Sequence, residues 1–100
     1  GAEALAFVQQ FRVTYAVLSV AAIAAPAGFL LQDLREAEFS RALIDRAEES
    51  IVAADASKFG RSAPIAIAPP DRFAQLVTDL APDAALTAFL AGHGTRITLA

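Results

Sequence analysis

Apolar and polar positions along this chain follow two periods in turn, that of a helix and that of a strand. Helical spacing of apolar residues predicts helices at about residues 2–11, 33–49 and 81–91. Short runs rich in β-branched and apolar residues predict strands at residues 13–20, 51–54, 75–78 and 95–99. Strands that alternate with helices indicate an α/β fold, with a mostly parallel sheet flanked by helices and right-handed crossovers between the strands.

The second and third helices carry boundary signals. Asp33 is suited to the N-cap of the second helix, and Glu36 three residues later completes a pair like a capping box. In the third helix, Pro82 suits an early position and Asp83 suits the positive end of the helix dipole. We expect Gly92 to end that helix.

Residues 13–31 contain no charged residue, which raises the alternative of a membrane span. The run lacks the leucine density, basic flank and aromatic belt of a span, and no basic segment precedes it as in a signal peptide. We therefore predict a central strand at residues 13–20 that is covered on both faces, followed by a loop with a turn at residues 25–28. No membrane partner is expected.

Composition indicates a surface that is normally covered. The sequence is 56% hydrophobic and its mean hydropathy is +0.49, both high for 100 residues. Either a partner subunit or another part of the protein can supply the cover. Because the first residues are predicted to be helical with no strand before them, we expect the chain to begin inside a larger fold.

Charge and cysteine content exclude several function classes. A net charge of -3 argues against binding to the phosphate backbone of a nucleic acid, because such binding needs clustered Lys and Arg. The absence of cysteine excludes disulfides and thiolate metal sites, and it fits the cytoplasm. His93, between two glycines, has no second histidine or cysteine with which to bind a metal, so a turn residue is the preferred interpretation. Nucleotide-binding and acyl-transfer motifs are also missing from the sequence.

The strongest candidate site lies in residues 51–60, IVAADASKFG, where an apolar run ends abruptly in small and charged residues. Ligands of open α/β sheets bind beyond the carboxyl ends of the strands. An acid, a hydroxyl and an ammonium at that place, from Asp55, Ser57 and Lys58, predict a site for a small anion. Lys58 is the only lysine in the sequence. The alternative is a solvated exit from a strand, in which Asp55 only hydrogen-bonds to the loop.

Two further acids are candidates for the same site. Glu36 opens a predicted helix and Asp79 follows a predicted strand. For Glu36 the structural interpretation is the stronger, since acids suit the N-terminus of a helix whether or not they bind a ligand. Asp79 is open to the same interpretation.

Several short motifs stand in a recognisable order between residues 36 and 94. They are EAE at residues 36–38, Arg41, DASKFG at residues 55–60, LVTD at residues 76–79 and GHG at residues 92–94. In this order and spacing they resemble the C-terminal effector-binding (sensor) domain of DeoR-type bacterial transcriptional regulators. The family pattern includes D-x-S-K-F-G, a strand that ends in T-D and a closing glycine turn.

The resemblance implies a fold like those of ribose-5-phosphate isomerase and the CoA transferases. It also implies a phosphorylated sugar or related metabolite as effector, with Lys58 at the phosphate and no cofactor. The helix-turn-helix of the family and the first half of its sensor domain, with a phosphate loop, have no counterpart in residues 1–100. We therefore expect one C-terminal portion of a sensor domain that oligomerises with its own kind, and DNA binding only through a domain absent from this chain.

Two alternatives to a transcriptional repressor remain open. The first is a sugar-phosphate isomerase, since that enzyme fold is shared and fold alone does not decide function. Against it, Ala21, Ala22 and Ala24 occupy the turn where the isomerases carry catalytic acids, so we expect no enzyme activity. The second alternative is a module that only pairs subunits, which a disordered or interface-buried loop around Lys58 would favour.

Overall fold

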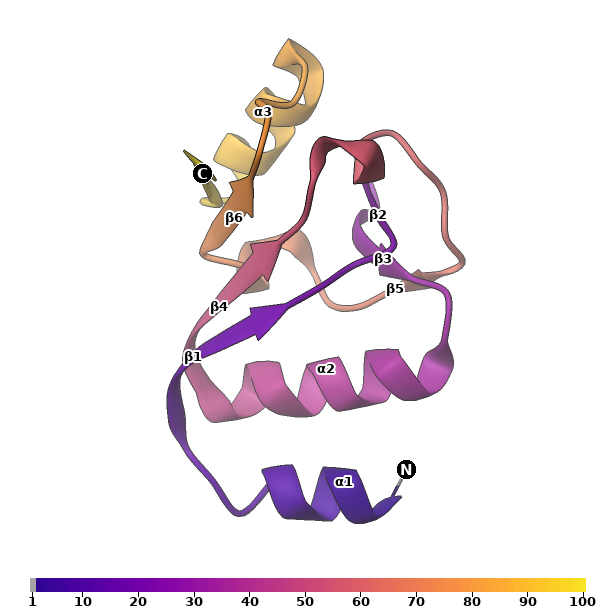
Figure 1. Cartoon of the computed structure of the whole chain (residues 1–100), viewed down its shortest axis with the longest axis vertical. Coiled ribbons are helices and arrows are strands. Elements are labelled where there is room, and N and C mark those ends of the chain that lie inside the picture. Colours follow the sequence, from indigo (N-terminus) through magenta and orange to yellow (C-terminus); the bar gives the residue numbers. More distant parts are fainter. Residues whose placement is uncertain (1) are drawn as a thin grey trace.

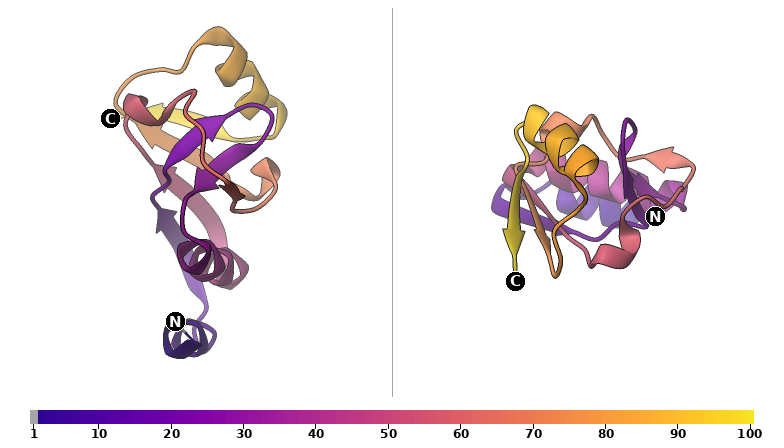
Figure 2. Two further views of the ribbon diagram at one scale, coloured as in Figure 1. Left: turned by 90° about the vertical axis from the view of Figure 1, so that its right-hand side faces the viewer. Right: turned by 90° about the horizontal axis from the view of Figure 1, so that it is seen from above.

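The computed structural model describes residues 2–100, which extend over 40 × 26 × 21 Å (Figure 1). The elements, in chain order, are α1 (Ala2–Val8), β1 (Val13–Leu18), β2 (Ala22–Ala24), β3 (Gly28–Leu31), α2 (Leu34–Arg46), β4 (Ala47–Ala53), the 3₁₀ helix η1 (Ala56–Lys58), β5 (Ile65–Ala66), the 3₁₀ helix η2 (Pro70–Arg72), β6 (Gln75–Thr78), α3 (Ala84–Gly92) and β7 (Arg96–Leu99). Along the long axis, α1 lies at one end beyond α2, and α3 lies at the other (Figure 2). Within residues 2–100, no helix has the length and apolar character needed to cross a membrane.

The main sheet is built by parallel pairing of four strands in the order β1-β4-β6-β7. One row across the sheet runs in register through Leu18, Val52, Leu76 and Ile97. The first three side chains are buried, and Ile97 packs against the same apolar cluster. Helix α2 packs on β1 and β4, and α3 packs on β7. The α/β fold with a mostly parallel sheet, predicted from the sequence, is therefore confirmed.

The prediction of a central strand covered on both faces at residues 13–20 is wrong. Strand β1 ends at Leu18, and it is an edge strand of the main sheet because only β4 pairs with it. Ala16 and Leu18 on one face are buried, whereas Tyr15 and Val17 on the other are 59% and 64% exposed. A near-continuous apolar run occurs both in strands covered on two faces and in strands with one open face. Hydrophobicity alone therefore did not show that Tyr15 and Val17 are exposed.

Residues 21–31 fold into strands where the sequence predicts a loop. Strands β2 and β3 form an antiparallel pair around a turn at residues 25–27, and β5 pairs with β3 to complete a second, three-stranded sheet. Only the turn was predicted. Gly28 follows it with φ +89°, and a Cβ at this position would lie 2.7 Å from Cγ of Pro70, so glycine allows the hairpin to approach η2.

Helix α2 ends three residues earlier than predicted. Asp33 is its N-cap, as expected, and accepts a 2.8 Å hydrogen bond from the backbone N–H of Arg35. The helix stops at Arg46, and the segment after it, predicted as its last turn, instead opens β4. There Glu49 pairs across the sheet with Tyr15 and forms a 2.7 Å ion pair with Arg96. Pairing with strands distant in the sequence therefore overrides a local helix preference.

The other helices also differ from the predictions at their ends. Helix α1 ends at Val8, although its helical period continues to residue 11. Helix α3 begins at Ala84, after Asp83, whose carboxylate accepts a 2.8 Å hydrogen bond from the N–H of Leu86 as the N-cap. Pro82 thus precedes the helix, and Gly92 is its last residue. The residue with positive φ is Gly94, at +79°.

The hydrophobic core lies between the two sheets and the helices α2 and α3. At its centre, the rings of Phe29 from the small sheet and Phe73 beside β6 are fully buried, with centroids 4.5 Å apart. Arg41 of α2 fixes the small sheet from outside, because its guanidinium donates hydrogen bonds of 2.7 Å and 2.9 Å to the carbonyls of Ile67 and Ala66. The two sheets therefore form one body with a shared interior.

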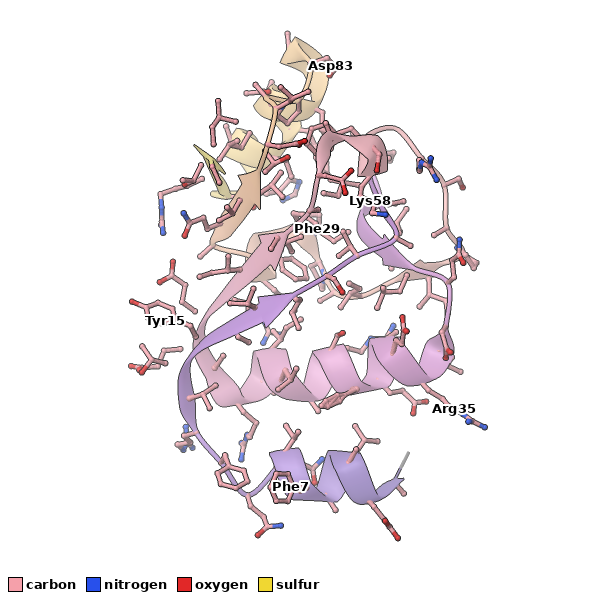
Figure 3. All side chains as sticks on the ribbon, viewed as in Figure 1. Phe7, Tyr15, Phe29, Arg35, Lys58 and Asp83 are labelled. Carbon is pink, nitrogen blue, oxygen red and sulfur yellow. The ribbon has the colours of Figure 1, made fainter. Side chains whose placement is uncertain are left out.

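We expect Phe29→Ala to lower the free energy of unfolding by about 3–5 kcal/mol, since it removes a fully buried ring from the centre of the core. Phe7→Ala is the matched control, because Phe7 on α1 is 61% exposed (Figure 3), and we expect it to change stability by less than about 1 kcal/mol. Urea unfolding followed by circular dichroism measures both. Equal losses in the two variants would contradict this description of the core.

Candidate functional site

The candidate site lies at the carboxyl edge of the main sheet. Strands β1, β4 and β6 are parallel, so the residues that follow them gather along this edge. They are Ser19 after β1, residues 54–58 after β4 and Asp79 after β6. The edge therefore collects Asp55, Ser57, Lys58 and Asp79, four of the residues singled out in the sequence.

Backbone hydrogen bonds and one carboxylate tie the loop after β4 to the end of β6. The N–H of Ala54 donates to the carbonyl of Val77 at 3.0 Å, which extends the pairing of the two strands by one step. Asp79 then accepts a 2.8 Å hydrogen bond from the N–H of Ala56 through Oδ1. The role that the structure shows for Asp79 is thus to hold the first turn of η1.

Asp55 caps the 3₁₀ helix that carries Lys58. Its Oδ1 accepts a 2.8 Å hydrogen bond from the N–H of Ser57, and its carbonyl accepts one of 3.1 Å from the N–H of Lys58. Hydrogen bonding by Ser57, from its side chain and its backbone, lowers the pKa of Asp55 below its ordinary value of 3.8, and the positive charge of Lys58 lowers it further. Asp55 is therefore ionised at neutral pH, and its carboxylate serves the loop backbone.

The far end of the loop is anchored to the small sheet. Phe59 forms a parallel bridge with Ile23 of β2, and the N–H of Gly60 donates to the carbonyl of Ile23 at 2.9 Å. Gly60 has φ +72°, a conformation that glycine adopts without strain. The half-buried ring of Phe59 packs against the core. Lys58 thus sits on a short segment that is fixed at both ends, between the two sheets.

Lys58 itself is half-buried, and its ammonium forms no ion pair or hydrogen bond with any side chain or carbonyl in residues 2–100. Figure 3 shows its side chain beside the small sheet, well away from the exposed Arg35 on α2. The charge of Lys58 acts on Asp55 without forming an ion pair, so the ammonium on this fixed loop is available to an anion from solution.

Glu36 lies apart from this loop. It is in the first turn of α2 and is exposed, and it lines a cavity beside the end of β1 together with Ser19 and Ser40. Residues 55–58 do not line that cavity. The structure therefore gathers four of the five candidates in one cluster and sets Glu36 beside a neighbouring hollow.

Sequence reasoning missed Ser19 and Ser40. Ser19 had a usable signal, because it directly follows the first parallel strand. Ser40 had none, since a serine inside a helix is ordinary. His93 contacts the ring of Phe89, at 4.8 Å between centroids, and residues 2–100 hold no group of three side chains able to bind a metal ion.

Known proteins match this chain over most of its length. A family model described as the DeoR C terminal sensor domain matches residues 1–80. The glycerol-3-phosphate regulon repressor of Escherichia coli (strain K12) is 27% identical over 99 residues, which are 99% of this chain and 39% of the relative. The HTH-type transcriptional repressor CsqR of the same organism is 32% identical over 99 residues, 38% of its length. The chain thus spans about two fifths of these curated relatives.

A third similar protein matches a shorter segment. The glycerol-3-phosphate regulon repressor of Haemophilus influenzae is 35% identical over 63 residues, which are 63% of this chain and 25% of the relative. The part of the chain that the family model matches includes the whole loop from Asp55 to Gly60 and also Asp79.

We expect the carboxyl of Asp55 to titrate with a midpoint below 3.8 in an NMR pH titration. Because the folded pKa is lowered, the contribution of Asp55 to stability is present above pH 3.8 and is lost as the pH falls through the folded pKa. Ser57→Ala removes the hydroxyl and should raise the midpoint toward 3.8, whereas the control Ser62→Ala should leave it unchanged. A midpoint at or above 3.8 in the unsubstituted chain would refute the hydrogen-bonded loop described above.

Proposed function

The chain belongs to the DeoR family as a C-terminal sensor domain, and on that premise we propose that it binds a phosphorylated sugar or related metabolite within a DNA-binding repressor. The observation that carries the proposal is the ammonium of Lys58, which is held on a loop fixed at both ends and forms no ion pair in residues 2–100. A phosphate accepts a charge-assisted hydrogen bond from such a group.

The neighbouring carboxylates support this assignment. Asp55 and Asp79 are acids that repel a phosphate when ionised, but each accepts a hydrogen bond from a backbone N–H of η1, which offsets part of that repulsion. Those N–H groups stabilise the two carboxylates and orient them toward the loop. Ser57 and Lys58 are then the polar groups of the loop best suited to an anion, with Asp55 and Asp79 as positioning residues and Glu36 as a contact for another part of the effector.

The relatives narrow the class of effector. Two of the similar proteins are named repressors of a glycerol-3-phosphate regulon. A phosphorylated polyol is accordingly among the effectors that we propose for this chain, beside phosphorylated sugars.

Effector binding would act on DNA through another domain. With a net charge of -3, this chain is poorly suited to a phosphate backbone. We propose that a helix-turn-helix domain elsewhere in the protein binds DNA, and that residues 1–100 are the C-terminal portion of the sensor. An effector that binds two conformations with different affinity then shifts the affinity for DNA. Such a repressor works in the cytoplasm and needs no cofactor.

An isomerase activity is not part of the proposal. The similar proteins named above are transcriptional repressors. Ala22 and Ala24, expected in a turn, instead belong to β2, where Ala22 is fully buried. Neither offers an acid that could move a proton on a sugar.

Homo-oligomers are proposed for the complete protein. The open face of β1 presents Val13, Tyr15 and Val17, and α1 with the segment after it presents Phe7 and Phe11. Exposed apolar surface of this kind marks an interaction site, and a self-complementary dimer is the commonest outcome.

We expect Lys58→Gln to weaken binding of the best phosphorylated ligand by roughly 10- to 100-fold, the loss of one charged hydrogen bond, while leaving the fold intact. Calorimetric titration of the complete gene product with glycerol 3-phosphate, ribose 5-phosphate and glucosamine 6-phosphate measures this. The matched control is Arg35→Gln, which removes a cation from the exposed side of α2 and should leave affinity unchanged. If Lys58→Gln and the unsubstituted protein bind the best phosphorylated ligand with equal affinity, Lys58 is only a solvated surface lysine.

We expect the complete gene product to sediment as an oligomer, and Tyr15→Glu with Val17→Glu to shift it toward the monomer, because the two charges oppose burial of the open face. Leu80→Glu is the control, since Leu80 is 63% exposed but lies after β6, away from β1. If the unsubstituted protein is a monomer at high concentration, or if the folded double variant still sediments as an oligomer, the open face of β1 is not the interface.

A further inference from the structure

A cavity of about 300 Å³ lies beside the carboxyl end of β1. The polar residues in its lining are Ser19, Glu36 and Ser40, and the apolar ones include Leu18, Leu31 and Phe39. Its volume is at the lower end of the range for small-molecule sites, and its wall combines three polar side chains with apolar ones.

The polar groups of this cavity are unused within residues 2–100. None of the side chains of Ser19, Glu36 and Ser40 has a hydrogen-bond or ion-pair partner in that part of the chain. Three other acids at helix and strand ends are hydrogen-bonded: Asp33 and Asp83 cap helices, and Asp79 accepts from Ala56. Glu36 suits the N-terminal turn of α2, but no donor within residues 2–100 occupies its carboxylate.

The chemistry of the cavity favours a neutral hydroxyl ligand over an anion. A carboxylate only accepts hydrogen bonds, and serine hydroxyls both donate and accept. No lysine or arginine lines the cavity, so the charge of Glu36 would repel a phosphate there. Adjacent hydroxyls of a polyol can donate to the carboxylate and exchange hydrogen bonds with the serines, while their carbon atoms rest on Leu18 and Phe39.

The cavity lies near the loop of Lys58 along the same edge. Leu18, the last residue of β1, pairs in register with Val52 of β4, so Ser19 is level with Ala53. The loop that carries Lys58 begins just past Ala53, on a strand about 5 Å from β1. The separation between the serine and the start of the loop is therefore on the order of 10 Å.

We propose that Ser19, Glu36 and Ser40 form a hydroxyl-binding subsite that selects phosphorylated polyols over phosphate esters without hydroxyl groups. The inference rests on the proposed function, in which Lys58 binds the phosphate. In this division of the site, the loop supplies the positive charge and the cavity recognises the polyol.

The test compares ligands that differ only in their hydroxyl groups. Glycerol 3-phosphate and n-propyl phosphate are titrated calorimetrically into the complete gene product, and ribose 5-phosphate replaces the first if it binds more tightly. We expect the unsubstituted protein to prefer the polyol. Glu36→Gln should weaken polyol binding by roughly 10- to 100-fold and Ser40→Ala by roughly 2- to 10-fold, and neither should change the affinity for propyl phosphate.

Control variants separate this inference from the proposed function. Glu38→Gln removes an acid of the same helix that does not line the cavity, and it should leave both affinities unchanged. Lys58→Gln should weaken both ligands together. Ser19→Ala provides an independent variant outside α2 if a substitution in the helix disturbs folding, which circular dichroism reports.

The outcomes are distinct. If Lys58→Gln weakens binding while Glu36→Gln, Ser40→Ala and Ser19→Ala do not, the proposed function stands and the hydroxyl subsite is wrong. Equal affinity of the unsubstituted protein for the polyol and for propyl phosphate also overturns the subsite. If no phosphorylated compound binds, both proposals fail together.

Discussion

The position of β4 between β1 and β6 is the constraint on which the rest of the structure depends. Its parallel pairing with β1 begins at Ala47 and ends α2 at Arg46, and its pairing with β6 follows from Ile51 onward. Pairing with both neighbours also sets the end of β4 at Ala53, which is the point where the loop of Lys58 leaves the sheet. The A-E-E sequence at residues 47–49 prefers a helix locally, but strand pairing places it in β4. The position of the candidate site follows from that pairing.

Around this loop, the negative charges hold the backbone in place, and the positive charge of Lys58 is left for a ligand. The two aspartates face backbone N–H groups, and the single lysine faces none of the acids at ion-pair distance. Backbone N–H groups stabilise carboxylates without adding a competing cation, so the acids can hold the loop close to the ammonium without neutralising it. This arrangement explains how a lysine loop held by two acids, Asp55 and Asp79, is compatible with an anion site.

The sequence was sufficient for the parallel sheet, the N-cap at Asp33, the strand at residues 75–78 and the place of Lys58 after a strand. These depend on local patterns of period, capping and turn chemistry. It was insufficient for the small sheet, whose strands β2, β3 and β5 are too short to show alternation and are paired across the chain. It was also insufficient for the open face of β1, because exposure depends on what lies above a strand and not on the strand itself. The cavity beside Glu36 could not be predicted for a similar reason, since Ser19 and Ser40 come together only after folding.

The bridge between Phe59 and Ile23 gives the loop a mechanical role as well as a chemical one. Lys58 is joined by one peptide bond to a residue that is paired with β2, and β2 belongs to a sheet that Arg41 fastens to α2. Both ends of the loop are hydrogen-bonded. A shift of the backbone at Lys58 would therefore act directly on β2, and through the hydrogen bonds of Arg41 the small sheet is joined to α2.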